Sequence, residues 1–346
     1  MKQLVKRAQR ILRSAYIRFL FCAGLLKWAK SRVAKSGAVV LTLHRVLTDS
    51  EYEVADSQRG MLVRAGSFES LLQYLQKHCS LVALDSPLAA DKREDSKPRV
   101  AVTFDDGWKD NFQTAFPIAR KFGLPFTVFI CPELIGGNGH FWTEVVCSLW
   151  GAARRAGKLH IMRALSGGMM NGSVDSLIER LKQASESERE TFITEVKAAL
   201  VRYNFKPHTS DLGELLDWDD VKEMSEAGVQ FGSHTNTHQI LTQIPQTEAL
   251  QELTQSKHAI EAQLRSCSWL AYPNGDWSEQ VRQLASDSGY HRAFSNSPGV
   301  WKQNTDPFCI PRINIWEGKL VGNNGRFSRV AVEYAVFWAA WRASRS

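Results

Sequence analysis

The sequence predicts an α/β fold built on a parallel sheet, either open or closed into a barrel. Short apolar runs alternate along the chain with longer amphipathic stretches, which is the pattern of repeated strand–helix units. The 346 residues are 44% apolar and 23% charged, a globular composition that excludes a disordered chain or a disulfide miniprotein. Six scattered cysteines without paired spacing indicate core residues in a reducing compartment.

The first segment, residues 1–36, is expected to form a basic amphipathic arm. Residues 1–35 carry ten Lys and Arg and no acid, so the chain's formal charge of +7 leaves −3 for the other 311 residues. Apolar residues recur at helical spacing from Leu4 to Phe19, which favours contact with an anionic membrane surface. A helix docked on its own domain and a solvated tail are the alternatives. Because the excess charge lies in the arm, we expect no nucleic-acid partner.

The expected cellular compartment is based on the signal peptide and the membrane-spanning helix that the sequence does not predict. No stretch has the continuous apolar core and cleavage site of a clear signal peptide, and none supplies the roughly 20 apolar residues of a spanning helix. We therefore expect a cytoplasmic protein that is peripheral on the cytoplasmic face of the inner membrane.

Residues 37–325 are expected to form the α/β body, followed by a C-terminal amphipathic helix over 326–346. The expected strands are 39–43, 100–104, 126–130, 229–231 and 269–272. The expected helices are 67–77, 111–122, 219–226, 248–265 and 278–288. From about 142 to 216 the pattern is purely helical, which predicts a helical insertion in the body, next to the entrance of the site.

The first polar cluster, Thr103-Phe104-Asp105-Asp106-Gly107, stands at the end of a predicted strand. The carboxyl ends of parallel strands form the reaction face of such folds. Neighbouring side chains of an extended segment point different ways, so the two carboxylates would have separate tasks, one on a metal and one facing water. A strand-ending turn is the structural alternative, because Asp-Asp-Gly is a common turn sequence.

The second cluster is the segment 233–238, which contains two histidines four residues apart. His234 and His238 would share one face of a helical turn and reach the same metal ion. Two histidines and one aspartate leave a ligand position for water, which is the arrangement of a catalytic zinc site.

The third cluster, Ala271-Tyr272-Pro273-Asn274-Gly275, is followed closely by Trp277. A proline turn at a strand end, with tyrosine and tryptophan beside it, suits the flat faces of a sugar. An ordinary turn between a strand and a helix is the alternative.

In this order, TFDDG, SHTNTH and AYPNG resemble the polysaccharide deacetylases of the NodB-homology group, carbohydrate esterase family 4, over about residues 38–315 without the insertion. The resemblance implies an irregular (β/α)7 barrel related to the TIM barrel, and removal of N-acetyl groups from amino sugars with one divalent metal ion. Zn²⁺ is the expected ion, with Co²⁺ or Ni²⁺ as alternatives. The resemblance makes Asp105 the general base and gives substrate contacts to Tyr272, Pro273, Asn274 and Trp277. It makes Asp106, His234 and His238 the metal ligands.

The sequence departs from the family pattern at two places. Many members carry an arginine where this chain has Ala271, and no histidine follows His291 to act as the general acid. A Leu-x-His element instead ends at His44, as in poly-N-acetylglucosamine deacetylases, whose motif order is circularly permuted. We therefore expect His44 to be the general acid. We expect Arg312 to replace the missing arginine, which in the family orients the base, and to be among the substrate-binding residues. A packed strand-end histidine and a structural ion pair are the alternatives.

The expected function is deacetylation of a cell-envelope polysaccharide or of its lipid-linked precursor. A deformylase of a lipid-linked amino sugar is an alternative with the same fold. A non-catalytic glycan-binding member of an envelope assembly complex is another, for which Ala271 is the hint. The oligomeric state is left open by the sequence.

Overall fold

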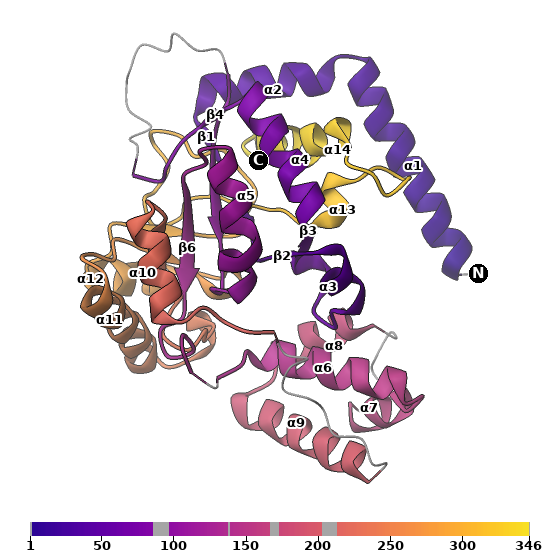
Figure 1. Ribbon diagram of the computed structural model, residues 1–346, viewed down its shortest axis with the longest axis vertical. Helices are drawn as coiled ribbons and strands as arrows, with labels where there is room; N and C mark the ends of the chain where they lie inside the picture. Colours follow the sequence, from indigo (N-terminus) through magenta and orange to yellow (C-terminus); the bar gives the residue numbers. More distant parts are fainter. Residues whose placement is uncertain (1, 86–96, 138, 167–172, 203–212, 346) are drawn as a thin grey trace.

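A curled, wholly parallel sheet forms the centre of the protein (Figure 1). The computed structural model describes residues 2–85, 97–137, 139–166, 173–202 and 213–345, with only the backbone of residues 2–11. The strands are β1 Ala38–Leu43, β4 Ser80–Leu81, β5 Arg99–Phe104, β6 Phe126–Ile130, β7 Gln230–Ser233, β8 Trp269–Ala271, β9 Arg292–Phe294 and β10 Ile313–Asn314. Their order is β10-β1-β5-β6-β7-β8-β9, with β4 beside the start of β5.

The seven strands of this path confirm the predicted irregular barrel. The two end strands approach each other through a parallel bridge between Phe294 and Ile310, so the barrel is incomplete at this seam. β1 lies between β5 and β10, which brings the first strand beside the last. Strands β9 and β10 were not predicted from the sequence, because segments of three and two residues are too short to show a periodic pattern. A separate two-stranded sheet joins β2 Arg45–Leu47 to β3 Leu62–Arg64.

Helices cover the outside of the sheet, and the main core lies between the two layers. These helices are α4 Ala65–His78, α5 Phe116–Lys121, α10 Trp218–Glu226, α11 Gln246–Gln263 and α12 Glu279–Asp287. The short helix α3 Asp49–Val54 instead contacts β2 and β3. The expected helix 111–122 begins with a π-helical segment, Asn111–Ala115, before α5. Phe68, Phe104 and Phe126 pack edge to face, with ring centres 5.8 and 5.5 Å apart, and so join α4 to β5 and β6.

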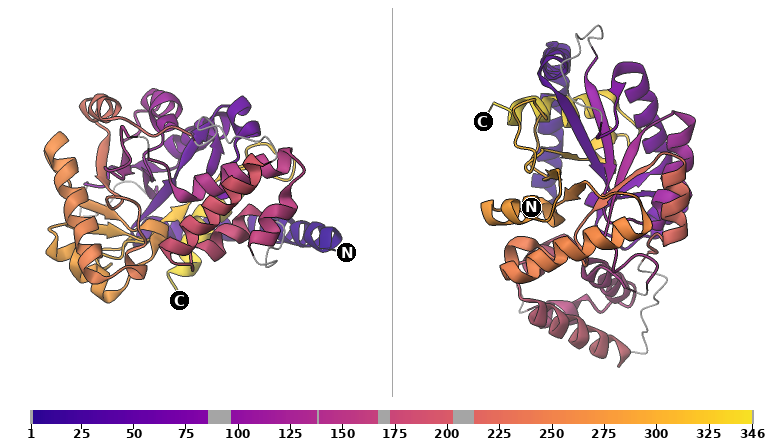
Figure 2. Two further views of the ribbon diagram at one scale, coloured as in Figure 1. Left: turned by 90° about the horizontal axis from the view of Figure 1, so that it is seen from below. Right: turned by 90° about the vertical axis from the view of Figure 1, so that its left-hand side faces the viewer.

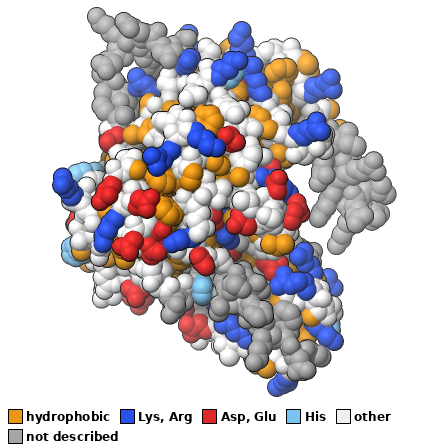
Figure 3. Space-filling model, viewed as in Figure 1, with side chains coloured by type: hydrophobic (Ala, Val, Ile, Leu, Met, Phe, Trp, Pro, Cys, Tyr) orange, Lys and Arg blue, Asp and Glu red, His pale blue; other side chains and the backbone are white. Residues whose placement is uncertain are grey.

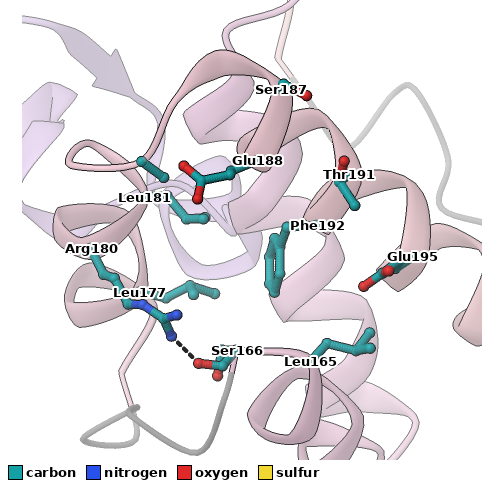
Figure 4. A pocket seen from close by; sticks show the side chains of 11 residues that line it. Leu165, Ser166, Leu177, Arg180, Leu181, Ser187, Glu188, Thr191, Phe192 and Glu195 are labelled. Atoms are coloured by element: carbon teal, nitrogen blue, oxygen red, sulfur yellow. Dashed lines mark hydrogen bonds between the residues drawn. The ribbon is translucent and has the colours of Figure 1, made fainter. Parts of the chain in front are cut away.

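The predicted helical insertion is present as α6 Trp142–Arg155, α7 Leu159–Leu165, α8 Val174–Leu181 and α9 Glu186–Val201. Figures 1 and 2 show it as a lobe beyond the end of the barrel to which β6 points. It has an apolar core of its own, and a capping box of Ser185 and Glu188 begins α9. A cavity of about 330 Å³ inside the lobe is lined by Phe192 and Arg180, which donates to the Ser166 carbonyl (Figure 4). The described residues around this cavity include no histidine or cysteine.

The predicted arm folds as two helices, α1 Lys2–Cys22 and α2 Leu25–Ser36, separated by Gly24 at a φ of 72°. Helix α2 buries Leu26 and Val33, and it packs against a C-terminal helix made of α14 Arg329–Glu333, the π-helical segment Tyr334–Trp338 and α15 Ala339–Ala343. The second half of the arm is therefore docked on its own domain. The side chains of Leu4, Ala8 and Ile11, which form most of the expected apolar stripe, lie outside the described residues.

Charge is unevenly distributed over the described surface. On the face shown in Figure 1, acidic side chains gather across the middle of the barrel, and Lys and Arg gather at its upper edge and over the insertion (Figure 3). Within the described ranges, no helix combines the length and the hydropathy that a membrane span requires.

Candidate active site and metal centre

A cavity of about 240 Å³ opens between the carboxyl ends of the barrel strands and the insertion. The chain bends directly after β1, β5 and β7, and each bend brings polar side chains to this edge. The predicted catalytic and ligand residues that line the cavity are His44, Asp105, Asp106, His234 and His238. The structure therefore gathers in one place residues that span almost 200 positions of the chain.

Asp106, His234 and His238 form a group that could hold one metal ion. Their three ligand atoms lie within 4.8 Å of one another. Asp106 Oδ1 is 3.6 Å from His234 Nε2 and 3.5 Å from His238 Nε2. Ligands about 2.1 Å from a tetrahedral ion lie about 3.4 Å apart, so these separations fit a single small divalent cation.

The two imidazoles are in the state that binds metal. Burial lowers the pKa of His234 to about 4, against opposing raising effects from Asp105 and Asp106. Burial also lowers the pKa of His238. The Nδ1 atom of His234 lies 2.7 Å from the Ala271 carbonyl oxygen, which makes Nδ1 the protonated nitrogen and leaves Nε2 with a free lone pair.

The local geometry of the histidine segment corrects the sequence prediction. His234 and His238 do not share a helical turn: they lie in an irregular loop after β7, with a φ of 65° at Thr235 and 66° at His238. Glu252 of α11 holds this loop by accepting hydrogen bonds from the backbone N–H groups of Asn236 and Thr237, at 2.9 and 2.8 Å. A carboxylate from a neighbouring helix therefore replaces helical hydrogen bonds in bringing the two imidazoles together.

Asp106 is oriented by its own backbone and by the next aromatic residue. Its φ of 78° is uncommon for a residue with a side chain, and Gly107 follows at 79°, where a Cβ would meet Ile130 at 2.9 Å. Trp108 donates from Nε1 to Asp106 Oδ2 at 2.9 Å, which leaves Oδ1 facing the histidines. Arg45 stacks on the Trp108 ring with its guanidinium carbon 4.4 Å from the ring centre.

Asp105 is buried against Arg312. Arg312 Nη1 and Nη2 donate to the two carboxylate oxygens at 2.7 and 2.8 Å, and both side chains are almost fully buried. Burial alone would raise the pKa of Asp105, but Arg312 and then His234 outweigh it and hold that pKa well below its usual range. Arg312 therefore makes the contact to Asp105 that is expected of the missing orienting arginine. It does not line the cavity, so its predicted contact with the substrate is not seen.

His44 follows β1 and lines the cavity with the other polar residues. Its carbonyl oxygen accepts a hydrogen bond from Asn111 Nδ2 at 2.8 Å, which fixes the backbone at this point. Its Nδ1 atom is buried without a hydrogen-bond partner among the described residues. The imidazole thus lines the site with its Nδ1 atom buried and unpaired within the described part of the chain.

The third sequence cluster contributes less to the cavity than predicted. Tyr272 is completely buried and donates to the Phe308 carbonyl oxygen at 3.1 Å, and Pro273 is buried beside it. Neither residue lines the cavity, and nor does the half-exposed Trp277. Asn274 does line it, at a φ of 60°, and accepts a hydrogen bond from Lys182 of the insertion at 2.7 Å.

Several functional side chains were absent from the sequence analysis. Trp108 stands two residues after Asp106, so its position next to the motif is a usable signal. Glu252, Lys182 and the buried Glu144 lie in helical segments or at their ends, with no local pattern that distinguishes them from other charged residues.

Comparisons with known proteins agree with the predicted family. Residues 92–293 match the sequence profile described as polysaccharide deacetylase. Over 271 residues the chain is 19% identical to YxkH of Bacillus subtilis (strain 168), named as a polysaccharide deacetylase, which covers 77% of this chain and 70% of that protein.

The solved structures that are similar in fold include two chains aligned over most of their length. The deacetylase PplD of Streptococcus pyogenes, in complex with acetate, aligns with a TM-score of 0.54 and 17% identity over 82% of this chain and 94% of PplD. IcaB from Ammonifex degensii aligns with a TM-score of 0.52 and 17% identity over 82% of this chain and 94% of IcaB. These similarities confirm the barrel architecture.

Proposed function

Because the chain belongs to the polysaccharide deacetylase family, we propose that it removes N-acetyl groups from amino sugars with one divalent ion held by Asp106, His234 and His238. The observation that carries this proposal is the buried carboxylate of Asp105 beside that cluster, bound by both nitrogens of Arg312. We favour Zn²⁺, because one carboxylate and two neutral imidazoles are typical zinc ligands and leave a position open. Co²⁺ and Ni²⁺ are the alternative ions.

The chain's own residues divide the acid and base work of amide hydrolysis. When bound, the metal would polarise the acetyl carbonyl and lower the pKa of water. Asp105, kept ionised by Arg312, accepts the proton of the attacking water. His44 donates a proton to the sugar nitrogen as the carbon–nitrogen bond breaks. The products are acetate and a free amino sugar.

The buried arginine argues against a non-catalytic glycan-binding protein. Ala271, which lacks the side chain common in the family, was the hint for such a function. Arg312 reaches Asp105 from the segment before β10 and provides a bidentate contact on the proposed base. Orientation of Asp105 therefore does not require an arginine at position 271.

For the substrate, we propose a single N-acetylated sugar unit of a cell-envelope glycan or of its lipid-linked precursor. The cavity of about 240 Å³ is below the roughly 300–1,000 Å³ of typical ligand sites, which favours one sugar unit at a time. We place the reaction at the cytoplasmic face of the inner membrane. The basic N-terminal arm and the six free cysteines support this location.

Acetate release from N-acetylglucosamine oligomers tests the proposal. Asp105→Asn should lower kcat at least 1,000-fold with the bound metal unchanged, and His44→Ala should lower it by about 100-fold. Asp287→Asn, on the exposed side of α12, is the matched control and should keep full activity. Normal turnover by Asp105→Asn would exclude Asp105 as the base, and reproducible absence of metal would exclude the metal centre.

A further inference from the structure

A second large cavity, of about 980 Å³, lies away from the catalytic residues, between α1 and the C-terminal part of the chain. One wall is the side of α1 that carries Arg13, Ile17 and Arg18. The other wall comprises α13 Glu317–Leu320, the loop after it, and α14. Figure 1 shows α1 running beside these segments. The volume is at the upper end of the range of ligand sites, and the proposed function does not use this cavity.

The described residues that line this cavity carry positive charge and no carboxylate. Arg13, Arg18 and Lys319 border it. Burial lowers the pKa of Lys319, and the nearby charge of Arg13 lowers it further. The adjacent acid Glu317 faces the other way, where it accepts hydrogen bonds from Ser67 Oγ and the Arg64 backbone. A bound anion would relieve the repulsion among these cations.

The opposite side of α1 is apolar and exposed. Leu12, Tyr16 and Phe19 follow one another at intervals of four and three residues, so they share a face, and they are 69%, 44% and 63% exposed. None of the three lines the cavity, but Tyr16 also packs edge to face on Tyr334 of the C-terminal helix, with ring centres 6.4 Å apart, so Leu12 and Phe19 are the fully free members within the described structure. Among the described residues, α1 and α2 carry five of the ten exposed large hydrophobic side chains, with Phe21 and Trp28 completing the set. Such a concentration in two consecutive helices is typical of an interaction surface.

We propose that α1 lies in the interface of a membrane, with Leu12, Tyr16 and Phe19 among the acyl chains, and that the cavity behind it binds the phosphate headgroup of an anionic lipid. Arg13, Arg18 and Lys319 bind the phosphate from two sides. A lipid bilayer is the occupant that matches the whole feature, because a helix in its interface faces acyl chains on its apolar side and phosphate headgroups on its cationic side. A free phosphate ion would occupy only the cavity. A protein partner would contact either the cavity or the apolar side of α1, but not both.

Sedimentation of the full chain with vesicles tests this site. Vesicles of phosphatidylcholine with one third phosphatidylglycerol should bind the protein at least tenfold more tightly than phosphatidylcholine alone. Lys319→Ala should weaken this binding about fivefold, and Lys319→Arg should restore it. Arg32→Ala removes a charge from the exposed side of α2, outside the cavity, and should change binding by less than twofold. An equal loss of vesicle binding in Lys319→Ala and Arg32→Ala would overturn the proposal, because it would show that any positive charge on this surface contributes to membrane attraction.

Two further measurements separate the lipid from other occupants. Leu12→Ser with Phe19→Ser changes only exposed side chains and should also weaken vesicle binding at least fivefold. Monomeric dihexanoyl phosphatidylglycerol should bind the wild type more tightly than Lys319→Ala when both are measured by titration calorimetry. Inorganic phosphate at the same concentration should bind neither protein detectably. Equal binding of inorganic phosphate to the wild type would show a free-phosphate site, and unchanged vesicle binding by the double variant would exclude the helix as the membrane contact.

Discussion

The bidentate contact between Arg312 and Asp105 is the best-defined feature of the site at the scale of residues. Arg312 is itself fixed by hydrogen bonds to the Ser295 carbonyl oxygen and to Asn296 Oδ1, at 3.1 and 3.0 Å. A planar guanidinium held at both ends orients the carboxylate, whereas a lysine would supply charge without that geometry.

We expect Arg312→Lys to lower kcat/KM by about 100-fold, because the proposed base would lose its orientation while the positive charge remains. Steady-state acetate release, together with the metal content of the same preparation, measures this effect. A variant within threefold of the wild type would show that charge alone is sufficient at this position.

The buried carboxyl group of Glu144 is expected to make the stability of the protein depend on pH. It is buried at the start of α6, where Ser57 donates to it and Arg45 Nη1 lies 3.9 Å away. Burial raises its pKa from 4.5 to about 7, although Arg45 and Ser57 oppose the shift. The carboxyl group of Glu144 therefore holds its proton more tightly in the folded protein than in the unfolded chain. This difference contributes to the free energy of unfolding in full below pH 4.5, and the contribution is lost as the pH rises through about 7.

We expect the free energy of unfolding of the wild type to fall by on the order of 3 kcal/mol more than that of Glu144→Gln between pH 4.5 and pH 8, since the amide does not titrate. Urea unfolding at several pH values provides the measurement. Glu195→Gln, on the exposed side of α9, should follow the wild type. Parallel pH profiles for the wild type and Glu144→Gln would contradict the raised pKa.

At the scale of elements, α11 positions the histidine loop. Besides its two backbone contacts, Glu252 accepts a hydrogen bond from the Thr237 hydroxyl at 2.7 Å, and Ser256 of the same helix pairs with Ser233 at 2.7 Å. The loop has backbone angles that residues with side chains rarely adopt, so its shape depends on these contacts. One helix thus determines whether the two imidazoles meet at one point.

We expect Glu252→Gln to weaken Zn²⁺ binding by 10- to 100-fold with the fold retained, because the loss of the negative charge weakens three hydrogen bonds to the loop. Competition with a chromophoric chelator measures the affinity. The control is Glu248→Gln, one turn earlier on α11 and exposed. Equal affinities in the two variants would mean that the loop keeps its shape without Glu252.

At the scale of the whole molecule, the insertion covers part of the catalytic cavity through two polar bridges. Lys182, after α8, donates to Asn274 Oδ1 of the barrel at 2.7 Å. Gln58 donates to Asp175 Oδ1 of α8 at 3.2 Å. These contacts join the insertion to the barrel rim, and they would restrict how a long glycan lies across the site.

We expect Lys182→Ala to raise the ratio of kcat/KM for long over short N-acetylglucosamine oligomers by about fivefold, which corresponds to the loss of one bridging hydrogen bond. Glu195→Gln is the control, because Glu195 is an exposed carboxylate of the insertion that does not line the catalytic cavity. An unchanged ratio in Lys182→Ala would show that the bridge does not limit access.

Much of the fold and of the candidate site was predictable from local sequence. The apolar runs that become β1, β5 and β6 are buried throughout or nearly so, which is why their pattern is strong. Asp105 and Asp106 follow such a run directly, so the strand pattern alone predicts that they lie at the reaction edge of the sheet. The helical geometry expected for His234 and His238 was wrong, because Glu252 stabilises a loop that no local pattern encodes.

The sequence by itself determined the chemical groups of the site and the strands that carry them: two adjacent carboxylates, two histidines four residues apart, and a Leu-x-His element at the first strand. Only the tertiary structure decided that Arg312 contacts Asp105 across 207 positions, that Lys182 reaches the barrel, and that Tyr272 is buried. The physical reason for the Arg312 contact is that β1 pairs with both β5 and β10, which brings the segment before β10 close to the end of β5. Contacts between such distant segments depend on strand register and helix packing, which are properties of the whole fold and not of any short segment.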